Sequence, residues 1–150
     1  MKLWMLCVLG AFLAWGCYVP FLHEGQKQLQ GGALRAFLCV GVAYFLTAVL
    51  VPLGLLGGGM EPWQFNTRGV TFATVAGVLG AAGALFVILA LKFGGTPLVV
   101  APLVFAGAPV VNALVSVGWH RPKSAPEVWF YLGLAMAATG AYLVLRFRPT

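Results

Sequence analysis

The sequence predicts an all-α membrane protein, a bundle of five transmembrane helices. Of its 150 residues, 61% are hydrophobic and 8% are charged, whereas a typical soluble domain is about half apolar and about a quarter charged. Five apolar stretches between charged breaks approach the length, about 20 residues, that crosses a hydrocarbon core. None shows the in/out alternation of a membrane β-barrel, so helices are predicted. The predicted helices are Leu3–Leu22, Ala33–Leu55, Val70–Leu91, Leu98–Gly118 and Val128–Leu145.

The first helix has a competing interpretation, because an apolar run after Met1 and Lys2 also resembles a signal peptide. The "LAWGC" ending at Cys17 is faintly similar to a lipoprotein cleavage site. The run continues for about five residues beyond that cysteine, too far for a typical signal sequence, and the bulky Trp15 lies beside the would-be cut. We therefore expect a retained helix.

The second helix is an uninterrupted apolar run, whereas the third and fifth are rich in small residues, which let membrane helices approach closely. Ala73, Gly77 and Ala81 of the third helix recur at every fourth position. Such spacing is common in ordinary membrane packing, so it predicts helix contacts and no particular function. The glycines predicted to pack against other helices are Gly77, Gly80, Gly83, Gly133 and Gly140.

The fourth helix contains two prolines, although proline removes a helix hydrogen bond. Pro102 and Pro109 are seven residues apart, close to two turns, and so point the same way. Asn112 and Ser116 flank this face. It suits a protein cleft or a wet cavity better than lipid, because freed carbonyls are satisfied there. A purely structural role, in which Asn112 bonds a neighbouring helix, is equally consistent.

No enzyme activity, metal or cofactor is expected. The chain lacks G-x-S-x-G, H-E-x-x-H and P-loop motifs, and its apolar stretches leave no room for a soluble catalytic or nucleic-acid-binding domain. His23 and His120 are predicted on opposite faces of the membrane, so they cannot share a metal. Cys7, Cys17 and Cys39 fall in predicted helices without C-x-x-C spacing.

The charged residues lie at the predicted membrane edges. The three acids, Glu24, Glu61 and Glu127, are in loops or at helix ends. An ionisable group inside a membrane usually marks a proton or ion pathway, and this chain has no acid within its predicted spans. The net charge of +6 reflects Lys and Arg beside membrane helices, so no nucleic-acid partner is expected.

Several stretches resemble the EamA unit of the drug/metabolite transporter superfamily. "GVLGAAGALFVILALKFGGTPLVVAPLVFAGAP", which starts at Gly77, is similar to the family's Gly/Ala-rich helix, its turn and the proline-bearing helix that follows. "FYLGLAMAATGAYLVL" is similar to the closing helix, and "AFLAWGCYVPFL" to the first. The resemblance implies one EamA-like domain over residues 1–150, in a bacterial inner membrane.

Two features depart from the family pattern. Relatives commonly have a Gly-Glu pair after the fourth helix, where this chain reads Gly118-Trp119-His120-Arg121. Family transporters also join two five-helix units in inverted orientation, and this chain contains one. A complete transporter would therefore need a homodimer, antiparallel or parallel, or a second EamA-like chain.

The resemblance implies transport of a small organic solute, a metabolite or drug, by alternating access. Such transporters bind their solute near the membrane midplane between repeats. The residues expected to line the path are Trp15, Tyr18, Pro102, Phe105, Pro109 and Asn112. A non-transporting scaffold or accessory subunit of a larger membrane complex is the alternative.

Charge gives a weak prediction of orientation. The face with the N-terminus carries Lys2, Arg68, Arg121 and Lys123, and the opposite face carries Lys27, Arg35, Lys92, Arg146 and Arg148. Because Lys and Arg mark the cytoplasmic side, five against four places the N-terminus outside by a small margin. So small a bias would let a chain insert both ways, which favours an antiparallel pair over a parallel one.

Overall fold

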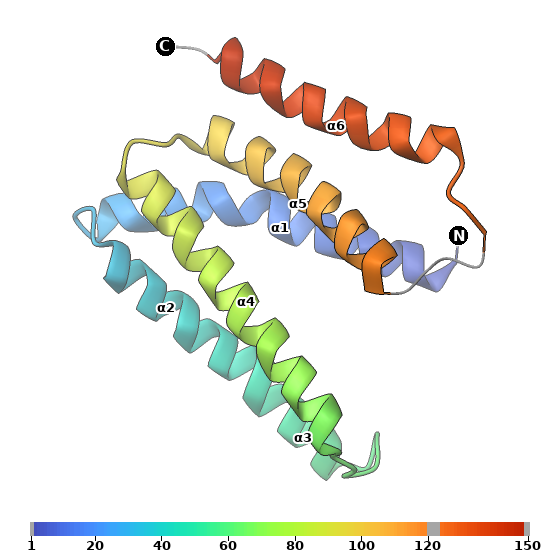
Figure 1. Ribbon diagram of the computed structural model, residues 1–150. Coiled ribbons are helices and arrows are strands. Elements are labelled where there is room, and N and C mark those ends of the chain that lie inside the picture. Colours follow the sequence, from blue (N-terminus) through green and yellow to red (C-terminus); the bar gives the residue numbers. More distant parts are fainter. Residues whose placement is uncertain (1, 120–123, 149–150) are drawn as a thin grey trace. The chain divides into compact units, whose positions relative to one another are not determined.

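The protein is all-helical, as the computed structural model shows (Figure 1). The structure describes residues 2–119 and 124–148, so His120, Arg121 and Lys123 of the sequence predictions lie outside it. Five helical segments of the described chain are long and apolar enough to cross a membrane. They confirm the predicted class of a multi-pass membrane protein. The segments are Leu3–Gln28, Ala33–Gly57, Thr67–Lys92, Pro97–Trp119 and Val128–Arg146.

The contacts divide the chain into two units. Unit 1 comprises residues 1–19 and 95–150, and unit 2 comprises residues 20–94. The first boundary falls within the helix α1 (Leu3–Gln28), immediately before Pro20. The helix continues through this proline, which has no N–H to donate to the carbonyl of Gly16.

Unit 2 contains the end of α1 followed by α2 (Ala33–Phe45), η1 (Leu46–Leu50), α3 (Val51–Gly57) and α4 (Thr67–Lys92). The helices α2 and α4 pack against each other (Figure 1). Its buried apolar residues come from the end of α1, the start of α2 and the end of α4, and three of them are alanines, which allow close helix approach. They are Leu22, Ala33, Ala36, Ala84, Val87, Ile88 and Leu91.

A buried polar contact joins the end of α1 to α4. The side chain of Gln26 is 5% exposed, and its Nε2 donates a hydrogen bond of 3.0 Å to the carbonyl oxygen of Ile88. Ile88 itself is fully buried. Buried amides of this kind fix how two helices meet, because breaking the bond leaves a polar group without solvent.

The first helix is longer than predicted, since α1 ends at Gln28 rather than at Leu22. The added segment is polar but helix-forming. Gln28 Nε2 donates a hydrogen bond of 2.9 Å to Glu24 Oε1. Lys27 Nζ lies 3.8 Å from Glu24 Oε2, and both contacts span one helical turn. The helix ends where Gln30 takes φ 55° and the N–H of Gly31 bonds the Gln26 carbonyl at 2.8 Å, a typical C-terminal cap.

The second span is interrupted by the π-helical turn η1, which sequence periodicity did not reveal. Pro52 follows it and has no N–H for the carbonyl of Ala48, four residues earlier. A wider π turn accommodates such a defect inside an otherwise α-helical segment. Thr47 lies in this turn, and its hydroxyl donates to the carbonyl of Ala43 at 2.8 Å.

The third span begins at Thr67, three residues earlier than predicted. Asn66 is the N-cap, and its Oδ1 accepts a hydrogen bond of 2.7 Å from the N–H of Gly69. In the preceding loop, Trp63 Nε1 donates 3.2 Å to the carbonyl of Leu56 near the end of α3. Both contacts satisfy main-chain groups that the helix ends leave open.

Unit 1 is built on the pair α5 (Pro97–Trp119) and α6 (Val128–Arg146), which pack against each other. Half-buried residues recur on both helices at spacings of three and four, which marks one seam along each. On α5 they include Leu103, Ala106, Val110 and Ala113, and on α6 Leu134, Ala137, Ala141 and Val144. The seam leaves the opposite side of α5 for other contacts.

Candidate functional site

Three of the predicted path residues form an aromatic cluster in unit 1. The ring centroids of Trp15 and Tyr18, one turn apart on α1, are 6.0 Å apart and tilted by 50°. The Phe105 ring of α5 lies edge-on to Trp15, with centroids 6.0 Å apart and planes at 90°. These distances suit favourable aromatic contacts. Trp15 remains 50% exposed, so its indole is still available to another molecule.

The other three predicted path residues lie on the same helix as Phe105. Pro102 is half-buried, one turn before Phe105, whereas Pro109 and Asn112 are exposed. Phe105, Pro109 and Asn112 are spaced by four and three residues and so share one side of α5. Pro109 has no N–H, so the carbonyl of Phe105 loses its α-helical donor on that side. The structure thus brings together the aromatic residues and leaves the polar end of this side uncovered.

The predicted packing glycines lie in open space within the described chain. A Cβ built on any of them would meet no atom within 4 Å outside its own stretch of helix. Contact through these glycines therefore stays a prediction. The glycines are Gly77, Gly80, Gly83, Gly133 and Gly140.

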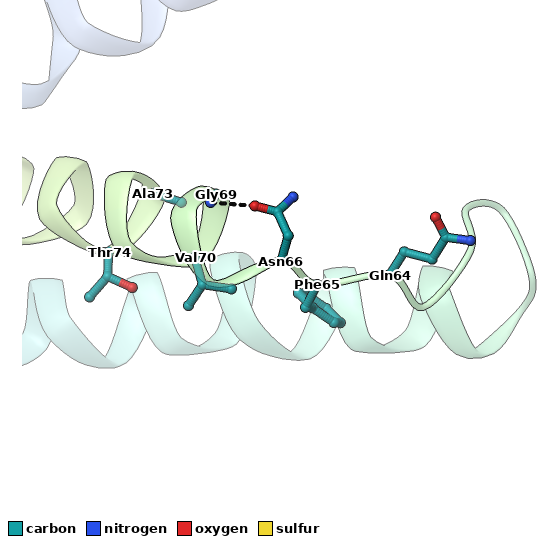
Figure 2. Close-up of a pocket in the computed structure, with 7 residues that line it drawn as sticks. All are labelled: Gln64, Phe65, Asn66, Gly69, Val70, Ala73 and Thr74. Atoms are coloured by element: carbon teal, nitrogen blue, oxygen red, sulfur yellow. Dashed lines mark hydrogen bonds between the residues drawn. The ribbon is translucent and has the colours of Figure 1, made fainter.

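A hollow at the start of α4 was not predicted from the sequence. Its volume is about 310 Å³. Figure 2 shows Val70 and Thr74 on one side of α4, and Asn66, the N-cap residue, at the start of the helix. Every lining residue is exposed, so the hollow is an open surface feature. An asparagine three residues before a glycine at the start of an apolar run was the available signal for the cap. The lining residues are Gln64, Phe65, Asn66, Gly69, Val70, Ala73 and Thr74.

Charged groups in the described chain lie near helix ends, where three cations sit over aromatic rings. The guanidinium of Arg68 is 5.9 Å from the Phe72 centroid, and that of Arg146 is 5.7 Å from Phe147. The ammonium of Lys92 is 6.0 Å from the adjacent phenylalanine ring. Basic and aromatic side chains gather in this way at membrane interfaces. Within residues 2–119 and 124–148, no three His, Cys, Asp or Glu side chains are grouped to hold a metal ion.

Comparisons with protein-family models, with curated proteins and with solved structures each gave no match.

Proposed function

We propose that the chain is one half of a transporter that moves a small organic solute across the membrane by alternating access. The proposal rests on the cluster of Trp15, Tyr18 and Phe105, because it joins residues of two helices far apart in sequence. It is further supported by the five membrane spans and by the resemblance of the helix sequences to an EamA unit. A single five-helix half of such a transporter is incomplete, so a second chain supplies the other wall of the path.

The surroundings of the cluster indicate the class of solute. Aromatic rings offer flat apolar surfaces, and the carboxamide of Asn112 offers one hydrogen-bond donor group and one acceptor. Glu61 and Glu127 lie outside the helices, and Glu24 lies in the polar last turns of α1, six residues after Tyr18. We therefore propose an uncharged or weakly polar aromatic solute, moved without a carboxylate in the membrane span. Facilitated diffusion or exchange fits this chemistry, and no catalysis is proposed.

The test is ligand-induced thermal stabilisation of the purified protein with a panel of small aromatic solutes. A ligand that binds only the folded state raises the apparent stability, by about 2.7 kcal/mol at 100 times its Kd. Trp15→Ala should weaken binding of any hit about three- to tenfold, the loss of one aromatic contact. Trp4→Ala is the matched control, because Trp4 is an exposed tryptophan on the same helix, 61% accessible.

Flux of each hit into liposomes then separates transport from binding. Flux that falls in Trp15→Ala but not in Trp4→Ala is the expected result. Equal stabilisation of both variants, or binding without flux, would contradict the proposed transport.

A scaffold or accessory subunit is the second candidate, favoured by the uncovered glycines of α4 and α6. A Cβ added at Gly77 or Gly133, for example, would meet no atom within 4 Å, although small residues are typical of helix contacts. Co-purification of a stoichiometric membrane partner, together with the absence of any stabilising solute, would select this function.

A further inference from the structure

Three basic side chains of unit 2 lie at the depth of the lipid headgroups. The helices α1 and α4 each have 26 residues, which is about 39 Å of helix, whereas a hydrocarbon core is about 30 Å thick. A centred helix therefore extends about three residues beyond the core at each end. Lys27 is the next-to-last residue of α1, and Lys92 is the last residue of α4. Arg35 is the third residue of α2, at the start of the next span.

The ends of α1 and α4 meet at one buried contact. Gln26, the residue before Lys27, donates its hydrogen bond to the carbonyl of Ile88. Lys92 follows Ile88 by one helical turn. The two lysines are therefore tied to the same contact, although they are far apart in the sequence.

Arg35 belongs to the same end of unit 2. Ala33 and Ala36, which flank it at the start of α2, are buried with the ends of α1 and α4. The side chain of Arg35 folds back over Gly32 in the turn between α1 and α2, since a Cβ added at Gly32 would meet the guanidinium carbon at 2.9 Å. The guanidinium is thus held beside the end of α1.

The positive charge at this end is only partly offset. The carboxylate of Glu24 lies 3.8 Å from Lys27 Nζ, and both side chains are more than half exposed. No other carboxylate lies at this end of unit 2, and no described carboxylate lies within 4 Å of Arg35 or Lys92. Three basic residues and one acid give this end a formal charge of +2.

The opposite end of unit 2 is balanced. It carries Glu61 in the loop before α4 and Arg68 in the first turn of α4, so its formal charge is zero. The excess charge of unit 2 therefore lies at one membrane surface. The prediction of an N-terminus outside places this surface at the cytoplasmic leaflet, which is rich in anionic lipids.

We propose that Lys27, Arg35 and Lys92, the basic junction, bind the headgroup of an anionic phospholipid. A guanidinium donates two parallel hydrogen bonds to a phosphate, and an ammonium group adds a compact positive charge. A zwitterionic headgroup also has a phosphate, but its own ammonium group cancels the charge. The basic junction shares no residue with the proposed solute path, so this inference is tested independently of transport.

The test is lipid retention by the full-length protein, purified with equal amounts of phosphatidylglycerol and phosphatidylcholine and analysed by native mass spectrometry. The wild type should retain phosphatidylglycerol in preference. Arg35→Gln and Lys92→Gln should each lower this preference about fivefold, the contribution of one cation near an anionic surface. Arg35→Lys, which keeps the charge, should retain most of the preference. Circular dichroism confirms that each variant is folded.

Arg68→Gln is the matched control. Arg68 and Lys92 lie at opposite ends of α4, and each places its cation about as far from a phenylalanine ring, at 5.9 and 6.0 Å. Arg68→Gln therefore removes the same charge from the same helix and should leave the lipid preference unchanged.

Four results would overturn the inference. A wild type without lipid preference would contradict it directly, and an equal loss in Arg68→Gln would indicate general attraction between a basic protein and acidic lipid. Arg35→Gln and Lys92→Gln that lower thermal stability without changing lipid preference would show that the cations serve the helices alone, for example by offsetting the dipole of α4. Inorganic phosphate that binds the protein in phosphatidylcholine as tightly as phosphatidylglycerol does would assign the basic junction to a free anion.

Discussion

Gln26 shows how one polar side chain fixes a helix end. Its amide donates to the Ile88 carbonyl while the residue is almost fully buried, 62 positions away in sequence. The Oε1 atom of Gln26 is also buried and has no hydrogen-bond partner among the described residues. The net contribution of Gln26 to the free energy of unfolding is therefore modest. Removing the side chain, however, breaks the hydrogen bond to Ile88 and creates a cavity.

Gln26→Ala should lower the free energy of unfolding by about 1–2 kcal/mol, because a hydrogen bond and buried side-chain volume are lost together. Gln28→Ala is the control, since Gln28 is exposed and bonds only Glu24 one turn away. Gln28→Ala should lower the free energy of unfolding by at most about 0.5 kcal/mol. SDS-titration unfolding followed by helical circular dichroism measures both. Equal losses would mean that the contact with Ile88 contributes nothing specific.

At the scale of the element, α2 and α4 do not meet through the glycines that the sequence singled out. The buried small residues are Ala33, Ala36 and Ala84, whereas Gly77 and Gly80 face open space. Small residues spaced by four identify a helix side that another helix can approach closely. The spacing does not show which of several such sides packs against a neighbouring helix. Which side of α4 packs depends on where α1 ends and α2 begins, because the buried residues of unit 2 lie there.

Ala36→Leu should destabilise the fold by about 1–3 kcal/mol, because three added carbons have no space at a buried position. Gly77→Ala should instead stabilise it by up to about 1 kcal/mol, since the methyl group meets nothing and alanine is the better helix former. The same unfolding titration measures both. A loss of stability in Gly77→Ala that appears only at high protein concentration would show that this side of α4 packs against another molecule.

At the scale of the whole molecule, orientation and pairing are linked. The count of five basic residues against four permits insertion both ways. A parallel pair, by contrast, requires two copies with the same orientation. The excess of one basic residue favours, by a small margin, the orientation with the N-terminus outside and, after five spans, the C-terminus inside.

A cysteine at position 148, Arg148→Cys, should be protected from an impermeant thiol reagent in intact cells that lack the three native cysteines. Met60→Cys is the control, because this exposed loop residue precedes α4 on the opposite side and should be labelled. Since Arg148 is itself one of the five charges, a cysteine appended after Thr150 should give the same result. Substantial labelled and protected fractions together would show dual insertion and contradict a single orientation.

The sequence was sufficient for the five helices, whereas the candidate site stays a prediction. Hydropathy placed all five spans, because the length of a hydrocarbon core sets the scale. The C-terminal end of α1 and the start of α4 differ from the predictions, because polar side chains form local hydrogen bonds there, at Gln28 and Asn66. The ring contact of Trp15 with Phe105 could not be predicted, because it depends on how two helices far apart in the sequence pack.

The order in which α1 gains its contacts during synthesis is set by where its neighbours lie in the sequence. Gln26 is made 62 residues before Ile88, which is about 3–12 s of synthesis at 5–20 residues per second. Unit 2 is complete once α4 has been inserted, whereas unit 1 holds both ends of the chain and must wait for the final helix. The nascent protein therefore holds a first helix with only part of its contacts formed, because Trp15 meets Phe105 only after α5 has been made.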